Sequence, residues 1–136
     1  MIHQREFRLK ARPRGFHYIT SEVLEQLPSL PDVGMLNLFI KHTSAGLTIN
    51  ENADPSVLDD LNSIFNRLVK DGESYYIHSY EGSDDMSAHA KTVLVGTSLN
   101  IPITNGQLNL GTWQGIYLCE FRDYGGPRSL IATVIG

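Results

Sequence analysis

The chain has 136 residues, of which 41% are hydrophobic and 19% are charged, and this predicts a single compact globular domain over residues 1–136. Its net charge of −4 disfavours nucleic acid as a partner, because nucleic-acid-binding proteins are normally basic. One cysteine, Cys119, excludes an internal disulfide and a cysteine-rich zinc module. No apolar stretch approaches the roughly 20 residues of a membrane helix, and the N-terminal segment lacks the apolar region of a secretory signal. We therefore expect a cytoplasmic protein with no membrane partner.

Cationic side chains are concentrated at the N-terminus. Alternation of apolar and cationic residues over 7–12 predicts a half-buried strand, which places most of these cations on one face. A solvated outer face explains the pattern better than a strip that binds phosphate or nucleic acid. The five cations in the first fourteen residues are Arg5, Arg8, Lys10, Arg12 and Arg14.

Periodicity predicts further elements before residue 51. The strongest is a strand over 35–41, because Leu36, Leu38 and Ile40 fall on one side of it. The others are a strand from Phe16 to Ile19, a helix from Thr20 or Ser21 to about Leu27 that Pro28 and Pro31 end, and a short segment from Leu47 to Asn50.

The clearest helical pattern covers residues 55–70. Asp54 is a favourable N-cap, Pro55 suits the first helical position, and Gly72 follows the end of the helix. A single apolar stripe along this helix predicts that one face is buried. The stripe consists of Val57, Leu58, Leu61, Ile64, Phe65, Leu68 and Val69.

The second half of the chain is rich in predicted strands. We expect a strand over 75–80, a second helix over 85–95 that Gly96 closes, and a hairpin turn at Asn105-Gly106. The mixed order of elements predicts an α+β fold, with a mixed or antiparallel β-sheet core and two main helices. The remaining strands are expected over 98–103, 108–110, 116–122 and 129–135.

The first candidate site follows the strand over 35–41, where His42, Thr43 and Ser44 enter a turn and a polar run continues to Asp54. An imidazole at this point could act as a ligand, an acid or a base, because its pKa lies near neutrality. The alternative is structural. Thr43 and Ser44 would satisfy backbone groups of the turn, and capping alone explains Asp54.

The second candidate site combines His78, at the expected end of a strand, with Asp84, Asp85 and His89 at the start of the next helix. Asp85 and His89 are four residues apart and therefore share a helix face. Two imidazoles and a carboxylate suit zinc or a similar divalent metal, although the spacing of the two histidines matches no known zinc motif. A helix cap at Asp85 and a surface histidine at His89 are the structural alternative.

The third candidate site is a glycine-flanked turn that contains Thr112, Trp113 and Gln114. Its N–H groups and polar side chains could hold a phosphate or a carboxylate, and Arg128 could clamp an anion or simply belong to a turn. A β-bulge or tight turn with Trp113 in the core is the structural alternative. Cys119 lies in the middle of a predicted strand, which indicates core packing rather than a nucleophile.

Three blocks of sequence resemble a known family: HTSAGLTINENAD from His42, EGSDDMSAH from Glu81 and LNLGTWQGIYLCEFR from Leu108. Over nearly its whole length the chain resembles the YjbQ-like family, whose members are often named secondary thiamine-phosphate synthase enzymes. The resemblance implies a low-level transfer that joins a hydroxymethylpyrimidine diphosphate to a thiazole phosphate and releases diphosphate. It also implies a compact α+β homotrimer with a polar cleft, and a divalent metal in some members.

The resemblance and the side-chain chemistry together suggest a role for each matching position. We expect a metal, zinc or magnesium, on His42, His78 and His89. We expect catalytic roles for His42, Glu51 and Asp85, with Asp85 orienting an imidazole. We expect a phosphorylated substrate to be bound by Ser44, Asn50, Thr112, Gln114 and Arg128. Tyr80 stands where many relatives have a further histidine.

Two functions remain open at this point. The first is an enzyme, a transferase of low activity of the thiamine-phosphate synthase type, whose physiological substrate the resemblance does not specify. The second is a non-catalytic module that binds a phosphorylated metabolite or a metal in the same cleft. The lack of a strong catalytic motif keeps the second function in consideration.

Overall fold

The computed structural model describes all residues from 1 to 136, as eight strands and three helices. The strands are β1 (Ile2–Leu9), β2 (Gly15–Tyr18), β3 (Val33–Ile40), β4 (Ala45–Glu51), β5 (Ser98–Thr104), β6 (Gln107–Leu108), β7 (Gln114–Glu120) and β8 (Arg128–Ile135). The helices are α1 (Thr20–Glu25), α2 (Ser56–Leu68) and α3 (Asp85–Val95). The predicted α+β fold is confirmed, and α2 and α3 are its two main helices.

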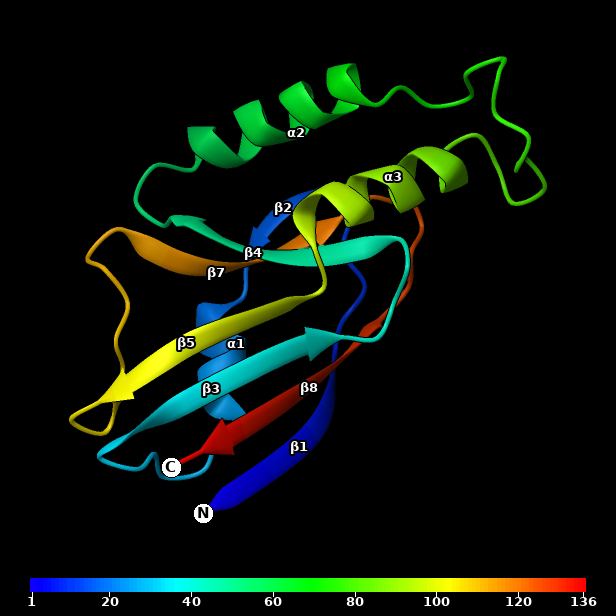
Figure 1. The fold of residues 1–136 in the computed structure, drawn as a ribbon. Helices are drawn as coiled ribbons and strands as arrows, with labels where there is room; N and C mark the ends of the chain where they lie inside the picture. Colours follow the sequence, from blue (N-terminus) through cyan, green and yellow to red (C-terminus); the bar gives the residue numbers. More distant parts are fainter.

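The elements form three layers (Figure 1). A five-stranded sheet has the order β1-β8-β3-β5-β6, and a three-stranded sheet has the order β2-β7-β4. Every strand pair is antiparallel. The main hydrophobic core lies between the two sheets, and α2 and α3 cover the other face of the three-stranded sheet.

The central strand of the small sheet, β7, contributes to two cores. Ile116 and Leu118 point into the main core, whereas Tyr117 and Cys119 point into a smaller core under the helices. Alternate residues of a strand face opposite sides, so one strand can serve both layers. Cys119 is fully buried in this smaller core, which confirms its interpretation as a packing residue, and burial raises the pKa of its thiol.

Helix α2 packs on the small sheet with only part of its apolar stripe. Leu58, Leu61 and Phe65 contact the smaller core, whereas Ile64 and Leu68 are exposed. The predicted stripe is therefore wider than the surface that the three strands can cover. None of the helices has the length and apolarity needed to cross a membrane.

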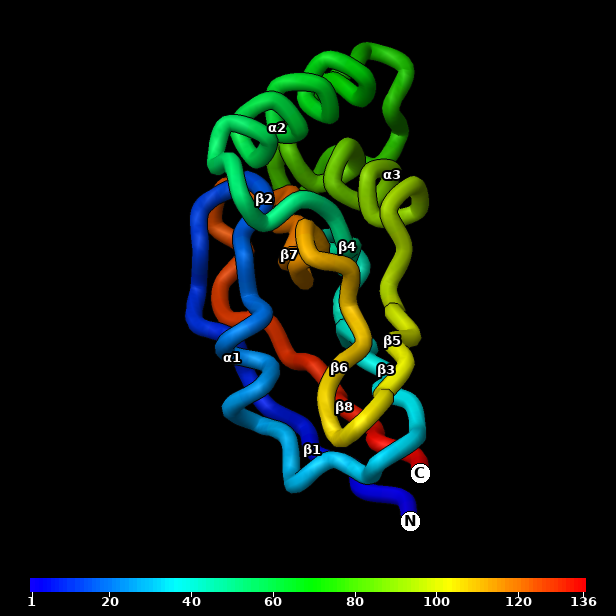
Figure 2. The backbone as a smooth tube through the Cα atoms, turned by 90° about the vertical axis from the view of Figure 1, so that its left-hand side faces the viewer, coloured from blue at the N-terminus to red at the C-terminus, as the bar shows by residue number.

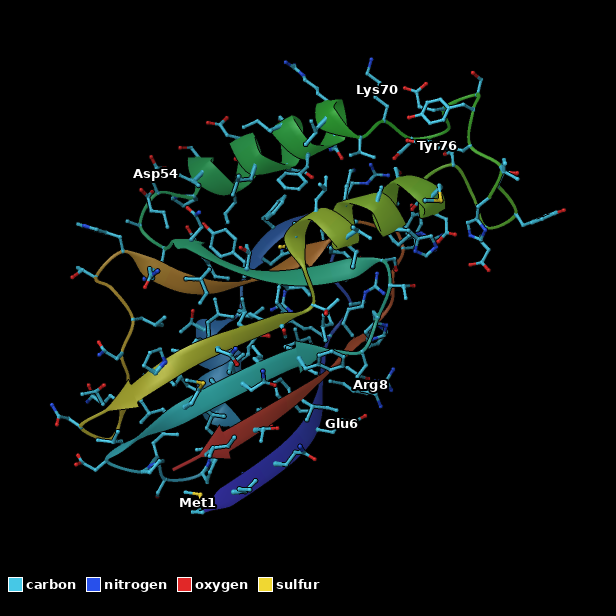
Figure 3. All side chains as sticks on the ribbon, in the orientation of Figure 1. Met1, Glu6, Arg8, Asp54, Lys70 and Tyr76 are labelled. Atoms are coloured by element: carbon cyan, nitrogen blue, oxygen red, sulfur yellow. The ribbon has the colours of Figure 1, made fainter.

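Two local predictions are confirmed by the backbone. The N–H of Ser56 donates a 2.9 Å hydrogen bond to Oδ1 of Asp54, so Asp54 caps the start of α2 (labelled in Figure 3). Asn105 and Gly106 adopt φ angles of 54° and 74°, the left-handed pair that a tight hairpin turn requires. This turn joins β5 to β6.

The predicted strand over 75–80 is wrong. The chain between α2 and α3 forms a loop, in which the N–H of Gly72 donates to the carbonyl of Ser83 at 3.0 Å. Tyr75, Ile77 and Tyr80 are largely exposed, because no strand edge pairs with this segment and no layer covers it. His78 is therefore presented by a loop instead of a strand end.

The two ends of the chain lie side by side at the edge of the five-stranded sheet (Figure 2). Ile2 pairs with Ile135 in the β1–β8 ladder, and the N–H of Gly136 donates to the carbonyl of Met1 at 3.0 Å. Trp113, directly before β7, is 65% exposed, so the structural alternative that placed it in the core is wrong.

Candidate metal centre

Three side chains converge at the N-terminal end of α3. Nε2 of His78 lies 2.8 Å, and Nε2 of His89 3.1 Å, from the same oxygen, Oδ2 of Asp85. The three candidate ligand atoms all lie within 4.8 Å of one another. Asp85 is only 2% exposed, whereas both imidazoles reach solvent. We refer to these residues as the His78–Asp85–His89 cluster.

A helix and the loop before it position the cluster. Asp85 begins α3 and His89 follows one turn later, so both side chains point to the same side. His78 arrives from the loop, which turns back toward the helix at Gly82 with a φ of 104°. Glycine adopts this left-handed conformation without a steric penalty. The sequence therefore predicted the helical pair but not the path that brings His78 to it.

Arg122, which follows β7, donates hydrogen bonds to Asp85 of the cluster and to the residues just before it. Its Nη1 donates to Oδ1 of Asp85 at 2.8 Å, its Nε to Oδ2 of Asp84 at 3.0 Å, and its Nη2 to the carbonyl of Glu81 at 2.8 Å. Burial opposes ionisation of Asp84, but hydrogen bonds from the N–H of Asp123 and from Arg122 lower its pKa. Sequence reasoning missed Arg122. Its only signal was a cation at the last position of the strand predicted over 116–122.

The contacts of the two ring nitrogens of His89 indicate which nitrogen carries a proton. Its Nδ1 lies 2.9 Å from the carbonyl oxygen of Thr43, which can only accept, so Nδ1 carries a proton. In a neutral ring Nε2 then has a lone pair, and this lone pair faces Oδ2 of Asp85 at 3.1 Å. Two acceptors at this distance require a proton or a cation between them. Either a proton shared by His89 and Asp85 or a bound metal ion satisfies this contact.

His42 lies outside the cluster. The N–H of Ser129 donates to its Nε2 at 2.8 Å, so this nitrogen is already occupied. The placement does not fit the predicted role as a metal ligand together with His78 and His89. Burial and then the nearby charge of Arg128 lower the pKa of His42, which favours a neutral ring.

A cavity of about 580 Å³ joins His42 to the cluster, because His42 and His89 both line it. Val93 is the one hydrophobic residue among those that line it. The remaining lining residues are Thr43, Thr92, Val93, Gly96 and Thr97.

Arg128 is buried, and its position does not fit the predicted role as a clamp for a substrate anion. Its Nε donates to Oε1 of Glu120 at 2.7 Å, and its Nη2 donates to Oε2 of the same carboxylate and to the carbonyl of Ser44. Glu120 is fully buried and Ser44 nearly so. The guanidinium is thus used to neutralise a buried carboxylate, which sequence reasoning did not identify.

Four predicted residues lie at the opposite end of the small sheet: Asn50, Glu51, Thr112 and Gln114. Glu51 pairs with Gln114 on the last rung of the β4–β7 ladder, while Thr43, just before β4, contacts His89. The seven residues of β4 span roughly 20 Å at about 3.3 Å per residue. One chain therefore separates the predicted site residues into two groups.

Comparison of the sequence with known proteins gives a consistent family. The model of the family described as UPF0047 protein YjbQ-like matches residues 5–136. The chain belongs to the YjbQ-like family. The UPF0047 protein YjbQ of Salmonella typhimurium is 50% identical over 138 residues, which cover 100% of this chain and 99% of that protein. A UPF0047 protein of Synechocystis is 42% identical over 135 residues, with 98% and 92% of the two chains covered.

Solved structures place the fold in the same YjbQ-like family. A YjbQ/UPF0047 family protein from Clostridium acetobutylicum matches with a TM-score of 0.82 at 40% identity, over 96% of this chain and 99% of that one. A YbjQ-like protein of unknown function from Sulfolobus solfataricus matches with a TM-score of 0.86 over 100% and 98% of the chains. Its 19% identity supports the fold alone. The function must therefore be argued from the site.

Proposed function

We propose that the His78–Asp85–His89 cluster binds a divalent metal ion, with zinc favoured over magnesium. Two imidazole nitrogens and a carboxylate oxygen suit zinc, whereas magnesium prefers oxygen ligands. The observation that carries this proposal is the convergence of Nε2 of His78, Nε2 of His89 and Oδ2 of Asp85, which all lie within 4.8 Å of one another. Three protein ligands would leave a fourth position for water or substrate, as in catalytic zinc sites.

We further propose that the chain is a transferase of low activity of the thiamine-phosphate synthase type, acting on phosphorylated small molecules. In this reaction the bond between the pyrimidine methylene carbon and a diphosphate oxygen breaks. The oxygen keeps the electron pair, and the thiazole nitrogen forms a bond to the same carbon. A metal ion at the cluster would neutralise the negative charge on the departing diphosphate.

The chain's own residues would hold and orient the diphosphate. Because Nε2 of His42 accepts from Ser129, Nδ1 is the ring nitrogen left to donate to a phosphate oxygen. The hydroxyl of Thr43 belongs to the same cavity beside His89 and supplies a second donor. The His42 ring and the Thr43 hydroxyl would bind the diphosphate instead of Arg128, because the guanidinium of Arg128 is hydrogen-bonded to Glu120.

We also propose a homotrimer, as the family resemblance implies. The outward face of the five-stranded sheet exposes several large apolar side chains, which a second copy could cover. These are Ile2, Val33, Met35, Phe39 and Ile135. Asn50, Glu51, Thr112 and Gln114 keep a role in catalysis or substrate binding only if another copy brings them to the cluster.

A non-catalytic module that binds a metal or a phosphorylated metabolite is the second candidate. The roughly 20 Å between the cluster and the group around Glu51 and Gln114 favours it, because one chain then lacks a complete catalytic set. The two candidates make different predictions. Only the transferase forms product from a pyrimidine diphosphate and a thiazole phosphate.

Elemental mass spectrometry of purified wild type, His89→Ala and His3→Ala decides the metal proposal. His3 is a histidine on β1, outside the cluster, and serves as the matched control. We expect near-stoichiometric zinc in wild type and His3→Ala and none in His89→Ala. Zinc-free wild type after incubation with zinc would overturn the proposal. Product formation by the zinc-loaded wild type then separates the transferase from the binding module.

A further inference from the structure

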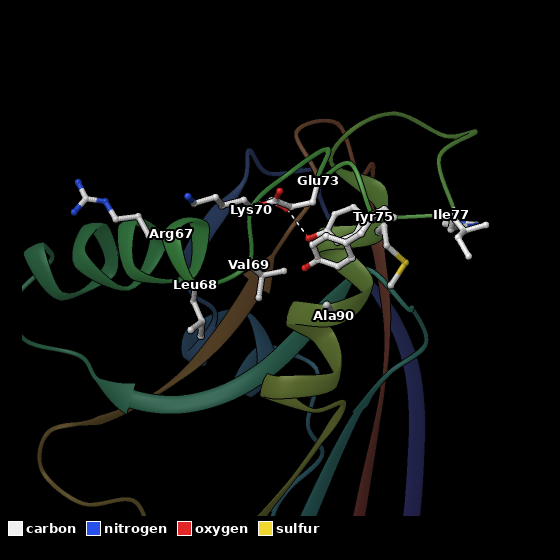
Figure 4. Close-up of a pocket in the computed structure, with 11 residues that line it drawn as sticks. Arg67, Leu68, Val69, Lys70, Glu73, Tyr75, Ile77 and Ala90 are labelled. Carbon is white, nitrogen blue, oxygen red and sulfur yellow. Dashed lines mark hydrogen bonds between the residues drawn. The ribbon is translucent and has the colours of Figure 1, made fainter.

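A second cavity, of about 660 Å³, lies between the C-terminal end of α2, the following loop and α3 (Figure 4). Its volume falls in the range of small-molecule sites. We propose that it binds a flat aromatic ring of the substrate, whose phosphate group reaches the cluster. This inference deepens the proposed function and rests on it. The walls consist of Arg67, Leu68, Val69, Lys70, Glu73, Tyr75, Tyr76, Ile77, His78, Met86 and Ala90.

Two tyrosines make one wall of this cavity aromatic. The hydroxyl of Tyr76 donates to the carbonyl of Lys70 at 2.7 Å, which fixes the ring in place. The ring of Tyr75 stands edge-on to it, at 4.9 Å and 77°, and both rings line the cavity (Figure 4). A flat ring can stack on or meet the edge of such side chains. The thioether of Met86 suits a ring edge as well.

The position of His78 connects the cavity to the cluster. This one residue lines the cavity and contacts Asp85 at 2.8 Å. A ligand whose ring occupies the cavity can therefore present a group on a short link to the metal ligands. Arg67 and Lys70 outnumber Glu73 among the charged lining residues. The excess of positive charge raises the electrostatic potential around the cavity and favours an anionic ligand over a neutral one.

The apolar part of the cavity has no cover within the chain. Ile77 is 94% exposed, and Tyr75 and Leu68, which also line the cavity, are exposed as well. Burying such groups against a ligand ring is favourable. The mixture of aromatic and charged walls fits an aromatic phosphate better than an apolar segment of another protein, which would leave the charges without partners.

The test compares benzyl phosphate with methyl phosphate by calorimetry on wild type, Tyr75→Ala and Tyr124→Ala, each with and without zinc. Tyr124 is 98% exposed and lines a different hollow, so it is the matched control. We expect wild type and Tyr124→Ala to bind benzyl phosphate about tenfold more tightly than methyl phosphate. Tyr75→Ala should lose this preference while its zinc content and its affinity for methyl phosphate stay unchanged.

Equal affinities for the two phosphates in wild type would overturn the inference. It would also be overturned if Tyr75→Ala kept the preference for benzyl phosphate. A Tyr75→Ala variant that changed only the oligomeric state in sedimentation would overturn it too, because a second copy of the chain would then cover the cavity. A preference that persists without zinc and disappears in Tyr75→Ala would support the ring site even if the metal proposal failed. The two proposals therefore fail separately.

Discussion

Nη1 of Arg122 donates a 2.8 Å hydrogen bond to Oδ1 of Asp85, while both imidazoles of the cluster meet the other oxygen, Oδ2. The buried carboxylate is thus held from one side by a permanent cation and remains directed to His78 and His89. Arg122 also binds the carbonyl of Glu81. It therefore fixes the end of the loop that carries His78 toward α3.

Arg122→Lys should lower zinc affinity about 10- to 100-fold, the usual effect of losing a partner that orients a metal ligand. Lysine keeps the charge but cannot reproduce the forked contacts to Asp84 and Asp85. A competition titration against a zinc chelator measures the change. Arg5→Lys, on β1, should bind zinc like wild type. Unchanged affinity in Arg122→Lys would show that Arg122 serves the fold alone.

Asp85→Asn should abolish zinc binding, because the amide has nearly the same shape but lacks the charge that stabilises the ion. It should also cost about 1.5–3 kcal/mol of stability, since a buried hydrogen bond to Arg122 loses its charged acceptor. Elemental analysis and urea unfolding in chelator measure the two effects. Asp60→Asn, on the exposed side of α2, is the control. Zinc retained by the Asp85→Asn variant would contradict the cluster as a metal site.

The neutral state of His42 predicts a loss of stability in acid. Its pKa lies below the ordinary 6.5, first because of burial and then because of Arg128. The unfolded chain therefore takes up this proton at higher pH than the folded chain. Stability should fall as the pH drops below about 6.5, and the loss is complete once the pH is below the folded pKa.

His42→Gln tests this pH dependence, because the amide oxygen can still accept from Ser129 but does not titrate. Wild type should lose free energy of unfolding relative to the variant as the pH falls from neutral through about 6.5 and toward the lowered folded pKa. Urea unfolding across this range measures the difference between the two curves. Parallel curves would mean that protonation of His42 costs the folded state nothing.

Arg128→Met should destabilise the fold by about 3–5 kcal/mol, because it leaves the carboxylate of Glu120 buried and unpaired. The double variant Arg128→Met/Glu120→Gln should recover much of this loss, since the charge is removed from both sides. Urea unfolding of the single and double variants measures both effects. A loss below about 1 kcal/mol, typical of an exposed ion pair, would instead support a free guanidinium available to a substrate.

The sequence by itself determined the local features that depend only on residues close together in the chain. The cap at Asp54 and the turn at Asn105-Gly106 were predictable because each depends on groups a few residues away. The helix over 85–95 has the predicted bounds. Its four-residue spacing therefore placed Asp85 beside His89 before any tertiary contact was known. The family resemblance, confirmed over residues 5–136, also required only the chain.

Tertiary structure alone decided which side chains from distant parts of the chain meet. His78 reaches the cluster through a loop because its segment has no strand edge to pair with, and alternation in the sequence cannot report a missing neighbour. Arg122 and Arg128 look alike in the sequence, yet one holds Asp85 and the other neutralises a carboxylate inside the core. The direction of β4 separates Glu51 from the His78–Asp85–His89 cluster. These contacts join residues far apart in the chain, so they depend on how sheets and helices pack and not on local pattern.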